Sequence, residues 1–165
     1  MKHLITSALL LLSLAGTAQT QPGLNIIATA GTNDFVTSPT VGNFGGELQL
    51  SGRYAGLSAT VEADSKFQNY TAVGAKLYVT VARFENMKLD WSAAAAKFVD
   101  KPARKKGDYT FRSEAYLSIP MTGDLDGRVG IGAIAQKFYF KKGPADWYIC
   151  PTLNFSLAYN LFGND

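Results

Sequence analysis

The stretch from Trp147 to Leu161 alternates between apolar and mostly polar side chains with a period of two residues. Because successive side chains of an extended chain point to opposite sides, this period predicts one β-strand with an apolar face and a mostly polar face. A strand of a soluble sheet usually has about 5–6 residues, whereas a strand that crosses a bilayer at a tilt needs about 9–11. The stretch is therefore long enough to cross a membrane.

Aromatic side chains mark both ends of its apolar face, at Trp147 and Tyr159. Their separation, 159 − 147 = 12 residues, corresponds to roughly 30 Å of height at about 3.3 Å per residue and a tilt near 40°. Aromatic rings at both borders of an apolar band are typical of membrane barrels, so both residues are predicted membrane-interface aromatics. The alternative left open is a long strand in a soluble barrel whose apolar face turns inward.

The first 18 residues have the three parts of a secretory signal peptide. A charged start precedes the apolar run Leu4–Leu14, and the small residues Ala15–Ala18 follow it. We expect cleavage after Ala18 or after Thr17, and a single domain over residues 19–165. The net charge of the whole sequence, +3, gives no reason to expect a nucleic-acid partner.

Seven further segments show the same alternation. Their approximate bounds are Leu24–Ala30, Glu47–Tyr54, Leu57–Asp64, Thr71–Val81, Met87–Ala95, Tyr109–Ile119 and Val129–Gln136. A β-bulge near Gln136 is expected, since it would restore Phe138 and Phe140 to the apolar side. Ser92–Phe98 is so rich in alanine that a short helix is the competing prediction there. Eight strands without a sustained helical period predict an all-β chain, and closure into a barrel removes the exposed edges.

The connections between these segments alternate in length, long after the first and fifth and short after the second and fourth. This alternation is typical of an up-and-down membrane barrel with both termini in the periplasm. The predicted fold is therefore an eight-stranded antiparallel up-and-down transmembrane β-barrel.

Charged side chains of both signs lie on the polar faces of the segments. If the apolar faces meet lipid, these charges converge in a narrow lumen and must pair there, because an unpaired buried ion costs several kcal/mol. We expect Tyr78 and Tyr116 to pack with them and leave no open pore. The predicted barrel-interior polar network consists of Glu47, Glu62, Lys76, Lys88, Asp90, Arg112 and Glu114.

Residues 19–165 contain no histidine. This excludes Ser-His-Asp hydrolysis and histidine metal sites, and Cys150 has no local base to activate it. The motif Gly130–Ala135 has the spacing of a dinucleotide-binding turn, but no helix is predicted after it. We expect no enzymatic activity and no cofactor or metal.

A basic set lies on two connections that the alternation assigns to the outside. We hypothesise that it meets phosphates of lipopolysaccharide or an anionic surface partner. The alternative is an ordinary solvated loop. The set consists of Lys101, Arg104, Lys105, Lys106, Lys141 and Lys142.

The pattern as a whole resembles the small eight-stranded outer-membrane barrels of the OmpA and OmpX kind. The resemblance covers residues 19–165 and rests on the alternation rather than on a motif. Such barrels usually end in an aromatic residue, whereas here Gly163, Asn164 and Asp165 follow Phe162. The resemblance implies an outer-membrane protein of a Gram-negative bacterium, embedded in lipid. Its expected role is structural or in surface interaction, alone or as a small subunit of a larger membrane protein complex. The competing function is that of an exported soluble lipocalin-like barrel that binds a small apolar ligand.

Overall fold

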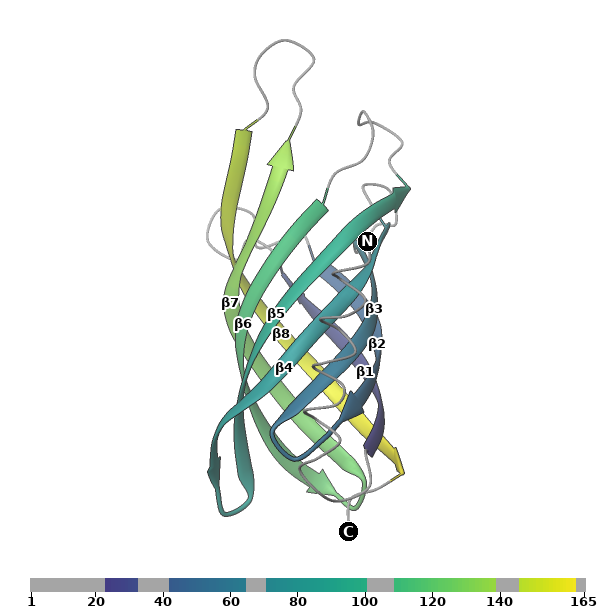
Figure 1. Cartoon of the computed structure of the whole chain (residues 1–165), viewed down its shortest axis with the longest axis vertical. Helices are drawn as coiled ribbons and strands as arrows, with labels where there is room; N and C mark the ends of the chain where they lie inside the picture. Colours follow the sequence, from purple (N-terminus) through teal and green to yellow (C-terminus); the bar gives the residue numbers. More distant parts are fainter. Residues whose placement is uncertain (1–22, 33–41, 65–70, 101–108, 139–145, 163–165) are drawn as a thin grey trace, which may run out of the picture.

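Eight antiparallel strands make up the part of the chain that the structure, a computed structural model, describes: residues 23–32, 42–64, 71–100, 109–138 and 146–162 (Figure 1). The strands are β1 (Gly23–Thr32), β2 (Gly42–Ser51), β3 (Ala55–Asp64), β4 (Thr71–Phe84), β5 (Met87–Asp100), β6 (Tyr109–Thr122), β7 (Leu125–Phe138) and β8 (Asp146–Phe162). Residues 1–18, the expected signal peptide, lie outside the described residues.

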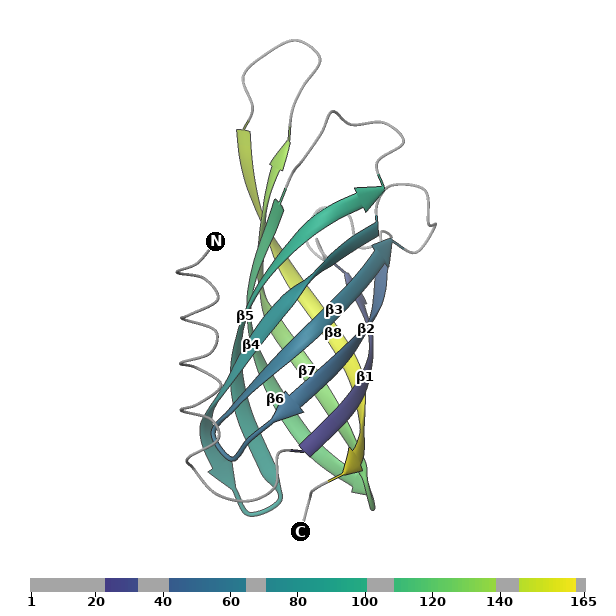
Figure 2. The same cartoon turned by 45° about the vertical axis from the view of Figure 1, so that its right-hand side comes forward.

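The strands close into a barrel because each pairs with its neighbours in sequence and β1 also pairs with β8. The closing register sets Ile26 opposite Tyr159 and Ala30 opposite Phe155. The strands run obliquely to the long axis of the barrel, as the two views in Figures 1 and 2 show. Every strand edge is thus paired, and the fold is the predicted all-β, eight-stranded antiparallel up-and-down barrel.

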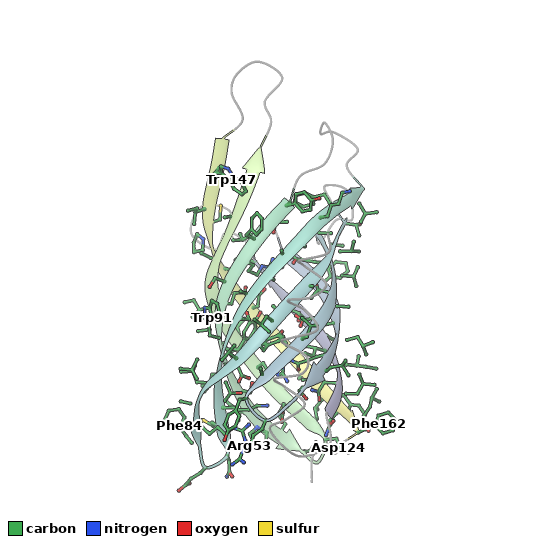
Figure 3. All side chains as sticks on the ribbon, in the orientation of Figure 1. Arg53, Phe84, Trp91, Asp124, Trp147 and Phe162 are labelled. Carbon is green, nitrogen blue, oxygen red and sulfur yellow. The ribbon has the colours of Figure 1, made fainter. Side chains whose placement is uncertain are left out.

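The short connections all lie at one end of the barrel, which we call the turn end. Between β2 and β3, the amide of Gly52 donates to the carbonyl oxygen of Ala55 at 2.7 Å. The β4–β5 and β6–β7 turns contain Glu85 and Gly123, whose φ angles of 27° and 48° are positive. Arg53, Phe84 and Asp124 mark this end in Figure 3, opposite Trp147. The other strand ends are joined by residues 33–41, 65–70, 101–108 and 139–145, which agrees with the predicted alternation.

Several details differ from the prediction, and most strands extend further than predicted. β2 begins at Gly42 rather than Glu47, because Gly45 and Gly46 pair with β1 at Thr29 and Ala28. β7 begins at Leu125, and its pairing with β8 continues through Gln136 without a shift, so the predicted bulge there is wrong. Register shifts occur instead near strand ends, between Leu24 and Asn25, Thr71 and Ala72, Thr80 and Ala82, and Pro120 and Thr122.

The alanine-rich segment Ser92–Phe98 is strand, not helix. Its weak intrinsic β preference is overridden because it pairs on both sides, with β4 and with β6. The competing helix prediction is therefore wrong.

Candidate functional site

The outer surface of the barrel is apolar on all eight strands. Phe155, for example, is 55% exposed and Leu157 49%. Further exposed apolar side chains on the other seven strands are Ile26, Leu48, Val61, Val73, Trp91, Phe111 and Ile131. The outward side is the one that the alternation predicts to be apolar, and Figure 3 shows side chains projecting outward along the length of the barrel.

The lumen holds the charged residues that the sequence singled out. Glu47, Lys76, Asp90 and Glu114 are buried, and Glu62, Lys88 and Arg112 are half-buried. The structure brings Glu47, Glu62, Lys76, Arg112 and Glu114 into one connected cluster, whereas Lys88 and Asp90 lie nearer the turn end.

Lys76 lies at the centre of this cluster. Its ammonium nitrogen is 2.8 Å from Glu47 Oε1, 3.0 Å from the Tyr116 hydroxyl and 3.7 Å from Glu114 Oε2. The Tyr78 hydroxyl donates to Glu47 Oε2 at 2.5 Å. Two carboxylates and the Tyr116 hydroxyl, which accepts a hydrogen bond from the ammonium, thus compensate the burial of Lys76, which is only 3% exposed.

Glu114 is the most enclosed carboxylate of the cluster. It accepts hydrogen bonds from the Tyr116 hydroxyl at 2.5 Å, from Thr152 Oγ1 at 2.8 Å and from Asn154 Nδ2. Arg112 Nε lies 3.7 Å from its Oε1. Thr152 and Asn154 lie on the polar face of β8, and Phe155 lies on its apolar face.

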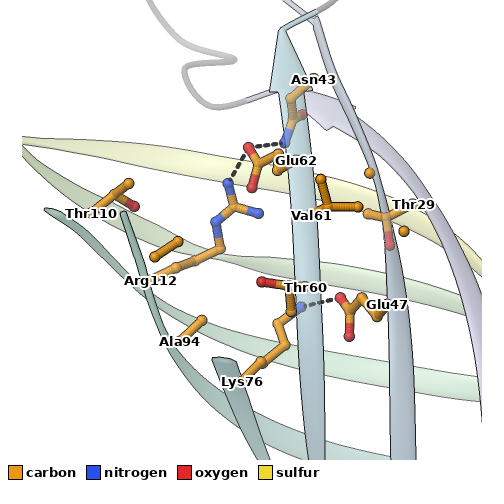
Figure 4. Close-up of a pocket in the computed structure, with 13 residues that line it drawn as sticks. Thr29, Asn43, Glu47, Thr60, Val61, Glu62, Lys76, Ala94, Thr110 and Arg112 are labelled. Carbon is orange, nitrogen blue, oxygen red and sulfur yellow. Dashed lines mark hydrogen bonds and ion pairs between the residues drawn. The ribbon is translucent and has the colours of Figure 1, made fainter. Parts of the chain in front are cut away.

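Arg112 extends the cluster toward the end of the lumen away from the turns. Its Nη2 is 2.7 Å from Glu62 Oε1, which also accepts a hydrogen bond from Asn43 Nδ2 at 2.8 Å (Figure 4). A cavity of about 40 Å³ lies among these side chains. Space of this size suits one or a few waters, far below the roughly 300 Å³ of a small-molecule pocket. In the described ranges no three His, Cys, Asp or Glu residues are grouped so as to hold a metal ion.

Sequence reasoning missed one buried charge, Arg128, which is 5% exposed. Its guanidinium lies 5.9 Å from the Tyr78 ring centroid, and both terminal nitrogens donate to Gln49 Oε1 at 3.3 Å. The alternation in the sequence could have predicted this position, because Arg128 precedes Gly130 by two residues and therefore lies on the same, polar face of the strand. It was missed because the predicted strand began at Val129, four residues after the observed start at Leu125.

The predicted interface aromatics both lie on the outer surface, with Trp147 52% exposed and Tyr159 49%. Trp147 packs near Phe111, with ring centroids 5.9 Å apart, at the end of the barrel opposite the turns. Phe84 and Phe162 lie at the turn end, and Trp91 lies about midway between the ends (Figure 3). Aromatic side chains therefore occur at both borders of the apolar surface.

The predicted contacts with an anionic partner are not placed. Lys101, Arg104, Lys105, Lys106, Lys141 and Lys142 all lie outside the described residues.

Packing inside the lumen depends on glycine beside Tyr116. A Cβ atom on Gly130 would lie 2.4 Å from the Tyr116 ring, which is a steric overlap. We expect Gly130→Ala to lower the free energy of unfolding by about 1–3 kcal/mol, because the ring and its hydroxyl contacts must shift. The matched control is Gly46→Ala, whose Cβ would have no neighbour closer than 3.9 Å. Urea unfolding of both variants in the same detergent checks this, and equal stabilities would contradict it.

Comparison with known proteins finds no family model that matches the chain and no match among curated proteins. One solved structure is similar, from work described as "De novo design of transmembrane beta-barrels". The TM-score is 0.52 at 13% identity, and the match covers 87% of this chain and 100% of that one. This chain shares the fold of that designed transmembrane barrel. At such low identity the similarity concerns the fold alone.

Proposed function

We propose that this protein is an integral outer-membrane β-barrel of a Gram-negative bacterium, of the OmpA and OmpX kind, with a structural or surface-interaction role and no enzymatic activity. The observation that supports it most is the distribution of polarity. Apolar side chains such as Val129 and Ile131 cover the outside, whereas ionic groups such as Lys76 and Glu114 are enclosed. Soluble monomers rarely expose contiguous apolar patches beyond a few hundred Å².

In water this arrangement would carry two free-energy costs. The apolar outer surface would stay hydrated, and the buried charges would lose their hydration. In a bilayer the outer apolar surface is matched to lipid, and a closed barrel leaves no backbone group unpaired against hydrocarbon. The lumen is occupied by its own side chains, so we propose no open channel. Interaction with lipopolysaccharide through the basic set, and membership of a larger membrane protein complex, belong to the same proposal.

The soluble alternative, a carrier of a small apolar ligand, needs an apolar lumen. The cavity lined by Glu47, Lys76 and Arg112 is only about 40 Å³. A larger pocket of about 300 Å³ at the turn end is lined mostly by charged and polar side chains. No observation on the described residues favours that function.

The two tryptophans provide a direct test, since the sequence contains only Trp91 and Trp147. In lipid vesicles we expect Trp91 to be quenched most by lipids brominated deep in their acyl chains, and Trp147 by lipids brominated near the headgroup. The reason is that Trp91 lies midway along the outer surface and Trp147 at one border (Figure 3). Each is measured alone, in the Trp147→Phe and Trp91→Phe variants.

A soluble barrel would show no bromolipid quenching of either tryptophan. It would also remain in the aqueous fraction after membranes are sedimented, whereas a membrane barrel is released only by detergent. Either result would contradict the proposal.

A further inference from the structure

Three adjacent strands set Lys88, Ser118 and Arg128 side by side near the turn end of the lumen. Lys88 of β5 is the register partner of Ser118 of β6, and Ser118 is the register partner of Arg128 of β7. Ser118 and Arg128 are 2% and 5% exposed, and Lys88 is half-buried. We call these three residues the basic row. They place two cations and one hydroxyl on adjacent strands at one level of the barrel.

The basic row has more hydrogen-bond donors than acceptors. Both terminal nitrogens of Arg128 share Gln49 Oε1 at 3.3 Å, and Asn25 Nδ2 donates to that same oxygen at 3.3 Å. Arg128 Nε and Ser118 Oγ are buried without any hydrogen-bond partner. Since a guanidinium carries five N–H donors and buried unpaired donors are costly, this region lacks an acceptor.

The nearby carboxylates of Asp90 and Asp126 attract Lys88 electrostatically but form no ion pair with it. Asp90 Oδ1 accepts the Thr80 hydroxyl at 2.8 Å, and Asp126 lines the cavity described below. Among the described residues, neither Lys88 nor Arg128 has a carboxylate oxygen within 4.0 Å. This contrasts with the central cluster, where Lys76 and Arg112 each lie within that distance of two carboxylates. At the rim, Arg83 adds a positive charge and Glu85 a negative one.

An open pocket of about 300 Å³ lies at the turn end and reaches the basic row at Lys88 and Ser118. Arg83, Glu85 and Asp126 also line it, whereas Arg128 does not. The volume of the pocket accommodates an oxyanion together with water. The ammonium and the hydroxyl that line this pocket, with the buried Arg128 guanidinium on the next strand, form a donor set that phosphate oxygens accept.

We propose that the basic row binds a phosphate group at the turn end of the lumen. Lys88 and Arg128 neutralise its charge, and the Ser118 hydroxyl donates a hydrogen bond to one of its oxygens. The phosphate belongs either to a small soluble molecule or to a lipid headgroup, because the same donors serve both. The site lies inside the barrel, so the proposal does not depend on the membrane role.

The test is titration of inorganic phosphate into the purified, folded protein in detergent, followed by calorimetry and by ³¹P resonance broadening. Sodium chloride at equal ionic strength serves as the reference. We expect phosphate to bind with a Kd of about 1 mM or tighter. Lys88→Gln is expected to weaken binding about tenfold, because it removes a charge-assisted hydrogen bond.

The matched control is Arg53→Gln, which removes a positive charge from the exposed turn at the same end, outside the basic row. Its affinity is expected to stay within about twofold of the parent protein, since exposed charges are screened. Folding is checked by the shift in gel mobility on heating. Should Lys88→Gln fail to fold, Ser118→Ala replaces it, with binding expected to weaken about threefold or more.

A second arm identifies the source of the phosphate. Inorganic phosphate is titrated into the protein in nanodiscs that contain phosphatidylglycerol. If this lipid lowers the affinity for inorganic phosphate in the parent protein but not in Lys88→Gln, the natural source is a lipid headgroup. An affinity unchanged from that in a phosphate-free detergent would identify a soluble phosphate. The proposal is overturned if phosphate has no effect beyond that of chloride, or if Lys88→Gln and Arg53→Gln bind it equally.

Discussion

The Lys76→Met variant is expected to lose about 3–5 kcal/mol of unfolding free energy, the cost of removing one partner from a buried ionic cluster. Lys76 lies between the Glu47 and Glu114 carboxylates, at 2.8 and 3.7 Å. Without it, Glu47 retains its hydrogen bond from the Tyr78 hydroxyl but has no cation within 4.0 Å among the described residues. Urea unfolding of the barrel in vesicles, followed by tryptophan fluorescence, measures the loss.

Two further variants separate the ionic effect from a general effect of substitution. Lys97→Met removes an exposed lysine from β5, and we expect a change within about 0.5 kcal/mol. The double variant Lys76→Met, Glu47→Gln should be more stable than Lys76→Met alone, with a coupling energy of about 1–3 kcal/mol, because the unpaired carboxylate is gone. A Lys76→Met barrel as stable as the parent, or a double variant with no recovery, would show that the cluster does not stabilise the fold.

The strand pattern and the inside-outside assignment could be predicted from the sequence because both depend on a local period of two residues. Leu157 and Asn154 differ in polarity, and that difference alone tells which side of β8 meets the lumen. Pairing across strands is not local. Gly45 and Gly46 have the composition of a loop, and only their pairing with β1 makes them strand. The same holds for the four consecutive alanines of β5.

The candidate site was predictable as a set of residues but not as a set of contacts. Alternation places Glu47, Lys76 and Glu114 on inward faces, yet the register between β2, β4 and β6 decides which of them meet. The acceptor shortage around Arg128 depends on the distance to Gln49, which no pattern encodes. The lumen also holds apolar side chains such as Ile27 and Ile134, which fill space between polar groups and carry no sequence signal of their own.

A charge introduced at the middle of the outer surface is expected to have the second large effect on stability. The direction of that stability change distinguishes a membrane barrel from a soluble one. Phe155 lies 155 − 147 = 8 residues after Trp147 and 162 − 155 = 7 before Phe162, with Ala30 and Val129 opposite it. We expect Phe155→Arg to destabilise the barrel in vesicles by about 2–4 kcal/mol, the cost of a guanidinium near the bilayer midplane. The folded fraction against urea, read from the gel-mobility shift, measures it.

Phe162→Arg is the matched control, because Phe162 is also an exposed phenylalanine but lies at the turn-end border (Figure 3). There the arginine reaches the headgroups, and the expected cost falls to about 0–1 kcal/mol. The difference between the two positions isolates depth in the bilayer from loss of an aromatic ring, which both variants share. In a soluble barrel both arginines would simply be hydrated, and both variants would be as stable as the parent or more soluble. Equal effects at the two positions would therefore contradict a membrane-spanning surface centred on Phe155.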